Sequence, residues 1–163
     1  MSNLPANIPP DFGAAIAQLG ERARLDVEDM KLMILLETAG EPLYHKLADL
    51  VSVPEAQDLL RENGREETAH AHRLKRAIEI LTGDPYEIPP LSDNPYAEPP
   101  AIPAVTEEVL EGVRAGELAG DDMYQRYADH EPNEEVAALL RQNGVEETRH
   151  SERVARAIEL IRA

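Results

Sequence analysis

The sequence predicts an all-α fold, a four-helix bundle made of two repeated antiparallel helical hairpins that are joined by a long Pro-rich crossover. Three observations predict it: the two halves of the chain resemble each other, apolar residues recur at helical spacing in each half, and a Pro-rich segment without periodicity separates the halves. The 163 residues suit one domain, and with only 4% aromatic residues the core must be largely aliphatic, as packed helices allow.

The two halves are related by an offset of 80 residues. Residues 59–81 (LLRENGREETAHAHRLKRAIEIL) and 139–161 (LLRQNGVEETRHSERVARAIELI) are identical at 14 of 23 positions. The same offset aligns weaker matches without gaps: Glu37 with Glu117, Gly40 with Gly120, and Tyr44 with Tyr124. Repeated units adopt the same structure, so about 25–82 and about 105–162 are each predicted to form one hairpin.

Each half is predicted to contain two helices. In the first half, one helix covers about 26–51, and the next begins near Pro54, a residue favoured in a first helical turn, and stops at Gly83. Short connections near 52–53 and 131–133 imply antiparallel packing within each hairpin.

Prolines mark two irregular places. Pro42 lies inside the first predicted helix and should kink it or locally break its hydrogen bonding. The crossover, 83–104, is long enough to run the length of the bundle and to place the second hairpin against the first. We therefore predict one domain over 1–163, with an N-terminal extension, 1–24, in which Phe12 to Leu19 would form a short helix that caps the bundle or supports a homodimer.

Composition and charge narrow the function classes. The net charge of −16 disfavours nucleic acid and anionic membranes as partners and attracts cations. The absence of Cys excludes disulfides, zinc-thiolate sites, iron–sulfur clusters and thiol catalysis. The segment MSNLPANIPPDF lacks the basic start and apolar core of a signal peptide, and no apolar run approaches a membrane span. We expect a soluble, cytoplasmic protein.

Acidic and imidazole side chains interrupt the apolar helix faces. The pairs Glu67–His70 and Glu147–His150 are each three residues apart and share a face with Leu74 and Val154, respectively. A lone Glu-x-x-His pair is usually a solvated surface feature. Here the pair recurs on an apolar stripe in both halves, and a buried carboxylate is costly unless it is paired or bound to metal.

Glu37 and Glu117 interrupt the apolar faces of the other two helices in the same way. Counted from the first interhelical turn, Glu37 lies about as far before it as Glu67 and His70 lie after it. An antiparallel hairpin places such residues at one level, and the offset of 80 implies the same for the second half. Four carboxylates and two imidazoles at one level would repel each other without divalent cations, and oxygen and imidazole ligands suit iron and manganese.

This pattern resembles that of ferritin-like di-iron carboxylate proteins of the rubrerythrin and bacterioferritin kind, over about 25–162. The resemblance implies a two-iron site, with manganese as the alternative, whose ligands are Glu37, Glu67, His70, Glu117, Glu147 and His150. It also implies that Tyr44 and Tyr124, two turns after their glutamates, support the ligands. Glu41 and Asp121 are further acidic groups that would pass iron inward or bond to a ligand His.

The implied function is a di-iron oxidase of the ferroxidase or peroxidase type, with dioxygen or peroxide as oxidant and an electron donor that the sequence does not identify. Two departures limit the resemblance: a chain without Cys has no rubredoxin-type iron domain, and Gly120 stands where rubrerythrins carry a further carboxylate. The resemblance therefore does not support ligand switching or efficient peroxide reduction.

Two other functions stay open: a di-manganese protein that dismutates peroxide, and a non-catalytic helical interaction module of ferritin-like ancestry. Intact ligands in both halves argue against the module. For organic oxygenation, the few aromatic residues and the small residues Ala39, Gly40, Ala119 and Gly120 predict no obvious substrate pocket.

Overall fold

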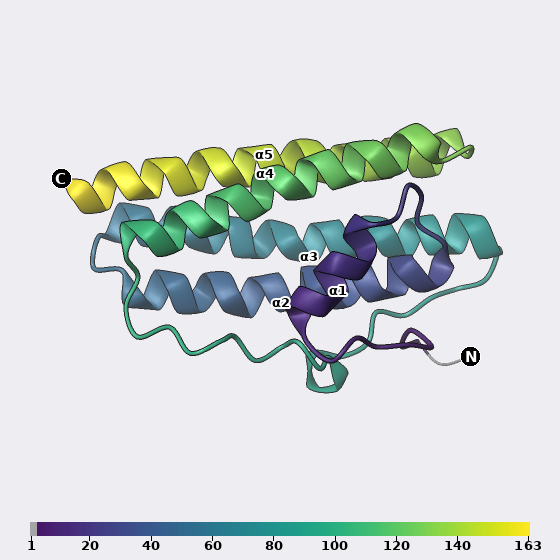
Figure 1. Ribbon diagram of the computed structural model, residues 1–163, viewed down its shortest axis with the longest axis horizontal. Coiled ribbons are helices and arrows are strands. Elements are labelled where there is room, and N and C mark those ends of the chain that lie inside the picture. The colour runs from purple at the N-terminus through teal and green to yellow at the C-terminus, as the bar shows by residue number, and fades with distance from the viewer. Residues whose placement is uncertain (1–2) are drawn as a thin grey trace.

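The structure, a computed structural model that describes residues 3–163, is an all-helical bundle (Figure 1). Its four long helices are α2 (Val27–Leu50), α3 (Pro54–Thr82), α4 (Glu107–His130) and α5 (Glu134–Arg162); α1 (Phe12–Gly20) and the 3₁₀ turn η1 (Leu91–Asp93) are short. The predicted all-α four-helix architecture is therefore confirmed. Among these residues, no helix combines the length and the hydropathy that a bilayer span requires.

Local sequence signals set the helix boundaries. Asp26 caps α2 by accepting a hydrogen bond from the Asp29 amide at 2.8 Å, and the Asp29 side chain accepts one from the Asp26 amide at 3.2 Å, which forms a capping box. Pro54 occupies the first turn of α3, and Gly83 ends that helix with a φ of 76°, a left-handed conformation that favours glycine. Asn133 caps α5.

Pro42 does not interrupt α2, which continues as one α-helix on both sides of it. The hydrogen bond that a proline cannot donate is lost, as its position predicts, but the helix does not end there. Apolar residues before and after the proline, including Ile34 and Leu47, are fully buried. Because both segments of α2 are held against α3, tertiary packing keeps them in one helix despite the lost hydrogen bond.

The long helices form two hairpins that pack against each other. α2 lies beside α3, and α4 beside α5, with three-residue connections at 51–53 and 131–133. α3 and α5 are the helices that join the hairpins. After α3 ends, the chain runs back along the α2 side of the bundle to the start of α4 (Figure 1). Asn94 anchors this crossover by donating to the Leu35 carbonyl at 2.7 Å and to the Thr38 hydroxyl at 2.9 Å.

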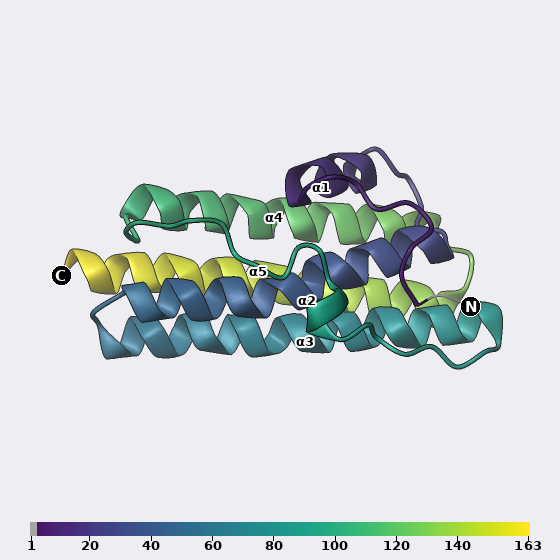
Figure 2. The same ribbon diagram turned by 90° about the horizontal axis from the view of Figure 1, so that it is seen from below.

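Helix α1 lies over α2 and the C-terminal half of α4 (Figure 2). Its apolar residues Ala15 and Leu19 are fully buried. Two side chains of α4 hold its C-terminal end: Tyr127 donates to the Leu19 carbonyl at 2.6 Å, and Arg126 donates to the Gly20 carbonyl at 2.8 Å. These bonds fix α1 as a cover across two helices.

The apolar core consists of two clusters, one toward each end of the bundle. One cluster contains Leu60 of α3 and Val154 of α5, and the other contains Leu74 of α3 and Leu140 of α5. The residues between them, at mid-bundle, are the acidic and imidazole side chains that interrupt each apolar stripe.

Candidate metal centre

The structure brings all six predicted ligand side chains into one cluster at mid-bundle. They form two overlapping groups, and within each group one potential ligand atom per residue lies within 4.8 Å of the others. The first group is Glu37, Glu67, His70 and Glu147; the second is Glu67, Glu117, Glu147 and His150. Glu67 and Glu147 belong to both groups, so both residues would take part in holding each of two metal ions.

The helices supply these groups in a regular way. Glu67 and His70 lie one turn apart on α3, and Glu147 and His150 one turn apart on α5, so each pair shares a face. Because α3 packs on α5, the two pairs face each other, and the His70 and His150 rings stack with centroids 5.1 Å apart.

The Nδ1 atoms of both histidines point at the carboxylates. Nδ1 of His70 lies 3.4 Å from Glu37 Oε2 and 3.5 Å from Glu147 Oε1. Nδ1 of His150 lies 3.4 Å from Glu67 Oε1 and 3.4 Å from Glu147 Oε2. Both rings are fully buried.

The donor set fits metal binding. Within residues 3–163, the buried Nδ1 atoms of His70 and His150 and Oε2 of Glu147 have no hydrogen-bond partner. Buried polar atoms are otherwise almost always paired. Carboxylate oxygens and neutral imidazole nitrogens are ligands for iron and manganese, so divalent ions at this place would satisfy all three atoms.

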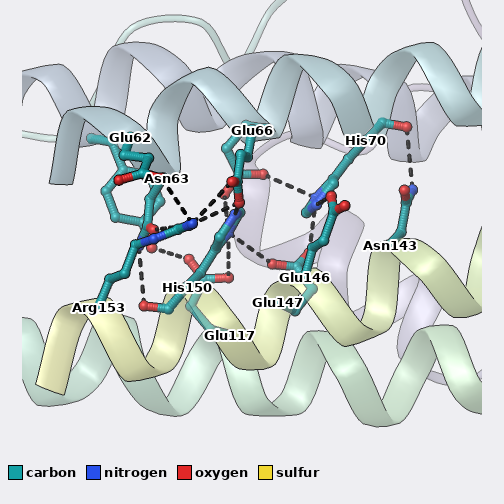
Figure 3. A network of polar contacts seen from close by, with 12 residues as sticks. Glu62, Asn63, Glu66, His70, Glu117, Asn143, Glu146, Glu147, His150 and Arg153 are labelled. Atoms are coloured by element: carbon teal, nitrogen blue, oxygen red, sulfur yellow. Dashed lines mark hydrogen bonds and ion pairs between the residues drawn. The ribbon is translucent and has the colours of Figure 1, made fainter. Parts of the chain in front are cut away.

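A glutamate from the opposite hairpin holds the outer nitrogen of each ring (Figure 3). Nε2 of His70 lies 3.1 Å from Glu146 Oε2, and Nε2 of His150 lies 3.0 Å from Glu66 Oε2. With Nε2 donating to a carboxylate, Nδ1 keeps a free lone pair for a metal ion, the arrangement that orients histidine ligands in metalloproteins. The residue next to each ligand glutamate thus supports the other half's histidine.

An arginine and an asparagine complete each of these networks. Arg73 donates to Glu146 at 2.6 Å and 2.9 Å and to Asn143, whose amide donates to the His70 carbonyl at 3.2 Å. In the mirrored network, Arg153 donates to Glu66, and Asn63 donates to the His150 carbonyl at 3.1 Å (Figure 3).

Sequence reasoning did not identify the asparagine and arginine roles. The available signal was that Asn63 and Asn143 recur at the same offset of 80 residues, and the structure shows that both are fully buried. Arg73 and Arg153 also occupy positions that differ by 80.

The two buried tyrosines also contact ligands of the opposite half. The Tyr44 hydroxyl donates to Glu117, and the Tyr124 hydroxyl donates to Glu37. Each hydroxyl therefore fixes the orientation of a carboxylate that belongs to one group only, and this carboxylate comes from the other half and is not the glutamate two turns before the tyrosine.

Glu41 and Asp121 contact other groups. Glu41 accepts a hydrogen bond from the Thr68 hydroxyl at 3.0 Å, and Asp121 accepts one from the Thr148 hydroxyl at 2.6 Å. The outer nitrogens of the two ligand histidines are occupied by Glu146 and Glu66 instead. The structure therefore places each acid between the two helices of its own hairpin, Glu41 between α2 and α3 and Asp121 between α4 and α5.

The electrostatics show how the cluster neutralises itself with protons. Burial and the charge of Glu147 raise the pKa of Glu67 well above its usual range and that of Glu117 to about 8. Burial alone would lower the pKa of His150, but its contacts with Glu117, Glu147 and Glu67 outweigh burial and raise the pKa to about 12. Metal binding would have to displace these protons.

The outer glutamates behave differently. The hydrogen bond from His70 lowers the pKa of Glu146 to about 2, an effect that Arg73 reinforces against partial burial. A permanently ionised Glu146 is suited to accept the Nε2 proton of His70.

Comparison with known proteins agrees with this geometry. No curated protein and no solved structure gave a significant match. The family model described as Rubrerythrin matches residues 30–158, a range that contains all six clustered carboxylate and imidazole residues. The chain belongs to the rubrerythrin family.

Proposed function

We propose that this protein is a di-iron carboxylate oxidase, which binds two iron ions through Glu37, Glu67, His70, Glu117, Glu147 and His150. The observation that carries the proposal is the pair of overlapping four-residue groups with two shared glutamates. Rubrerythrin family membership supports iron as the metal. When bound, two Fe(II) ions would supply the two electrons that reduce peroxide to water or dioxygen to peroxide, and Fe(II) itself would be the substrate of a ferroxidase.

The residues of the chain would fix the geometry of this reaction. Glu146 and Glu66 orient the histidines, and Tyr124 and Tyr44 hold Glu37 and Glu117. The two apolar clusters on either side keep bulk water from the centre along the bundle axis. A buried, pre-ordered set of ligands reduces the reorganisation that metal binding and oxidation require.

Metal stoichiometry tests the proposal directly. Protein reconstituted with Fe(II) under anaerobic conditions should bind two irons per chain, and admission of air or peroxide should oxidise both. Elemental analysis of natively purified protein then separates iron from manganese. Binding near zero would refute the metal centre, and native manganese would favour peroxide dismutation.

Histidine variants test whether the six residues form one centre. Because Glu67 and Glu147 belong to both groups, His70→Ala should weaken the binding of both metals, and His150→Ala should do the same. His72→Ala is the matched control, since His72 is an exposed histidine of the same helix. A His70→Ala variant that keeps one metal at wild-type affinity would contradict a shared centre.

A further inference from the structure

A cavity of about 350 Å³ lies directly beside the candidate metal centre. Its walls are apolar and come from α1, α2 and α4, including Phe12, Ile16, Met33, Leu36, Val113 and Met123. Its inner end is formed by the four clustered glutamates. The small residues predicted that no substrate pocket would be present. This prediction is wrong, because Gly40, Ala119 and Gly120 are themselves part of the cavity lining.

The two halves differ at one level of the cavity wall. Leu36 of α2 lines the cavity and is buried, whereas the position 80 residues later on α4 is Gly116. A Cβ atom placed on Gly116 would meet no atom within 4 Å. Gly116 is exposed, so no side chain at this position of the second half narrows the cavity.

Among residues 3–163, the lining of the cavity contains no Lys, Arg or His side chain. The Tyr44 and Tyr124 hydroxyls line it, but each donates to a glutamate. The remaining polar groups of the lining are carboxylates, among them the buried, unpaired Oε2 of Glu147. An anionic molecule would meet no positive charge on these walls, whereas an uncharged apolar one would meet aliphatic side chains over most of its surface.

Size and cover restrict the occupant further. An apolar cavity of about 150 Å³ holds one benzene molecule, so this cavity would hold a molecule of roughly a dozen non-hydrogen atoms, far more than dioxygen or peroxide needs. Phe12 and Ile16 of helix α1 line the outer side and are 44% and 37% exposed, while Glu37, Glu67 and Glu147 at the inner end are buried and Glu117 is partly buried. Helix α1 contributes Phe12 and Ile16 to this outer side, so it already occupies part of the opening.

We propose that this cavity is a binding site for an uncharged, predominantly apolar organic molecule of about a dozen non-hydrogen atoms, with one end against the four glutamates and the other under α1. The site rests on the shape and lining of the cavity and does not depend on the redox function proposed above. A molecule bound there would lie against the metal ligands.

The methionines provide a direct test with naphthalene as the probe. Met33 and Met123 line the cavity, whereas Met30, on the same helix as Met33, is buried outside it. In the full-length, metal-stripped protein labelled at the methionine methyl groups, naphthalene should shift the Met33 and Met123 resonances saturably and leave the Met30 resonance unchanged. No saturable shift, or equal shifts at all three, would overturn the proposal.

A matched pair of glycine substitutions tests the location independently. Gly116→Leu and Gly112→Leu each copy the residue that the first half carries, Leu36 and Leu32, onto the same helix. A Cβ atom at either glycine meets nothing within 4 Å, but only Gly116 lines the cavity. Both substitutions replace glycine by a better helix former, so both variants should fold, which circular dichroism checks.

Gly116→Leu should weaken naphthalene binding roughly tenfold or more, which corresponds to the loss of only about two buried methylene contacts. Gly112→Leu should bind as the unmodified protein does. Equal affinities in the two variants would overturn the assignment, and so would a loss of binding in Gly112→Leu alone. Because the protein is metal-stripped, these outcomes are independent of whether two irons bind.

Discussion

Gly40 and Gly120 occupy equivalent positions in the two halves but have different surroundings, and this difference predicts opposite effects of the same substitution. A Cβ atom on Gly40 would lie 2.8 Å from Cγ and 2.9 Å from Cδ of Glu67, closer than carbon atoms approach. On Gly120 the nearest atoms, those of Glu147, are 3.5 Å away, which is ordinary van der Waals contact.

The magnitudes follow from two opposing contributions. Alanine in place of glycine inside a helix stabilises the fold by about 1 kcal/mol. At Gly120 no contact opposes this, so Gly120→Ala should stabilise the metal-free protein by up to about 1 kcal/mol. At Gly40 the buried Glu67 must move, and overpacking of this kind costs about 1–3 kcal/mol, so Gly40→Ala should leave stability unchanged or lower it by up to about 2 kcal/mol.

Thermal and urea unfolding of the two metal-free variants measures the difference, which should be about 1–3 kcal/mol, or several degrees in Tm for a chain of this size. Since Glu67 belongs to both four-residue groups, Gly40→Ala should also weaken binding of both metals, whereas Gly120→Ala should not. If Gly40→Ala were stabilised as much as Gly120→Ala, the close approach of α2 to Glu67 would be disproved.

Three further substitutions probe the supporting groups. Glu146→Gln should weaken metal binding about 10–100-fold, because the His70 ring loses its ionised partner. Titration calorimetry with Zn²⁺ measures the affinity, and an unchanged affinity would show that Glu146 does not position the ring. Tyr124→Phe leaves the buried Glu37 short of a hydrogen bond and should destabilise the protein by about 1–3 kcal/mol in urea unfolding, so wild-type stability would contradict that bond. The pKa of Glu117, raised to about 8 from an ordinary value of 4.5, stabilises the fold while the acid is protonated, and this contribution is lost as the pH rises through 8. The Tm of metal-free protein should therefore fall between pH 6 and 9, and Glu117→Gln should reduce that fall; an equal fall in the variant would refute the assignment.

The sequence predicted the six clustered residues because their placement depends only on helical periodicity and on the offset of 80 residues. It did not establish the roles of Glu66 and Glu146, because each lies about 100° around the helix from its neighbouring ligand and meets a histidine only where α3 packs on α5. The spacing of residues along one helix does not show which residues of another helix they contact.

Two other features depended on tertiary structure for the same reason. The sequence predicts that Pro42 removes a hydrogen bond from α2. It does not predict that α2 continues, which depends on the burial of apolar residues on both sides of Pro42. The cavity depends on the small residues and also on the distance between α2 and α4 and on the position of α1, which the sequence does not give. The small residues alone suggest tight packing instead.

The difference between Leu36 and Gly116 has a consequence for what a fused pair of hairpins can achieve. Two separate, identical hairpin chains would carry the same residue at both positions, so a void beside the shared centre would either occur on both helices or on neither. A single chain that encodes both hairpins removes this constraint. It can keep the six clustered carboxylate and imidazole residues at equivalent positions, as the proposed two-ion site would require, and still vary the neighbouring positions one at a time. Under the proposed function, access to the centre from one side could then change without any change in the residues that would hold the ions.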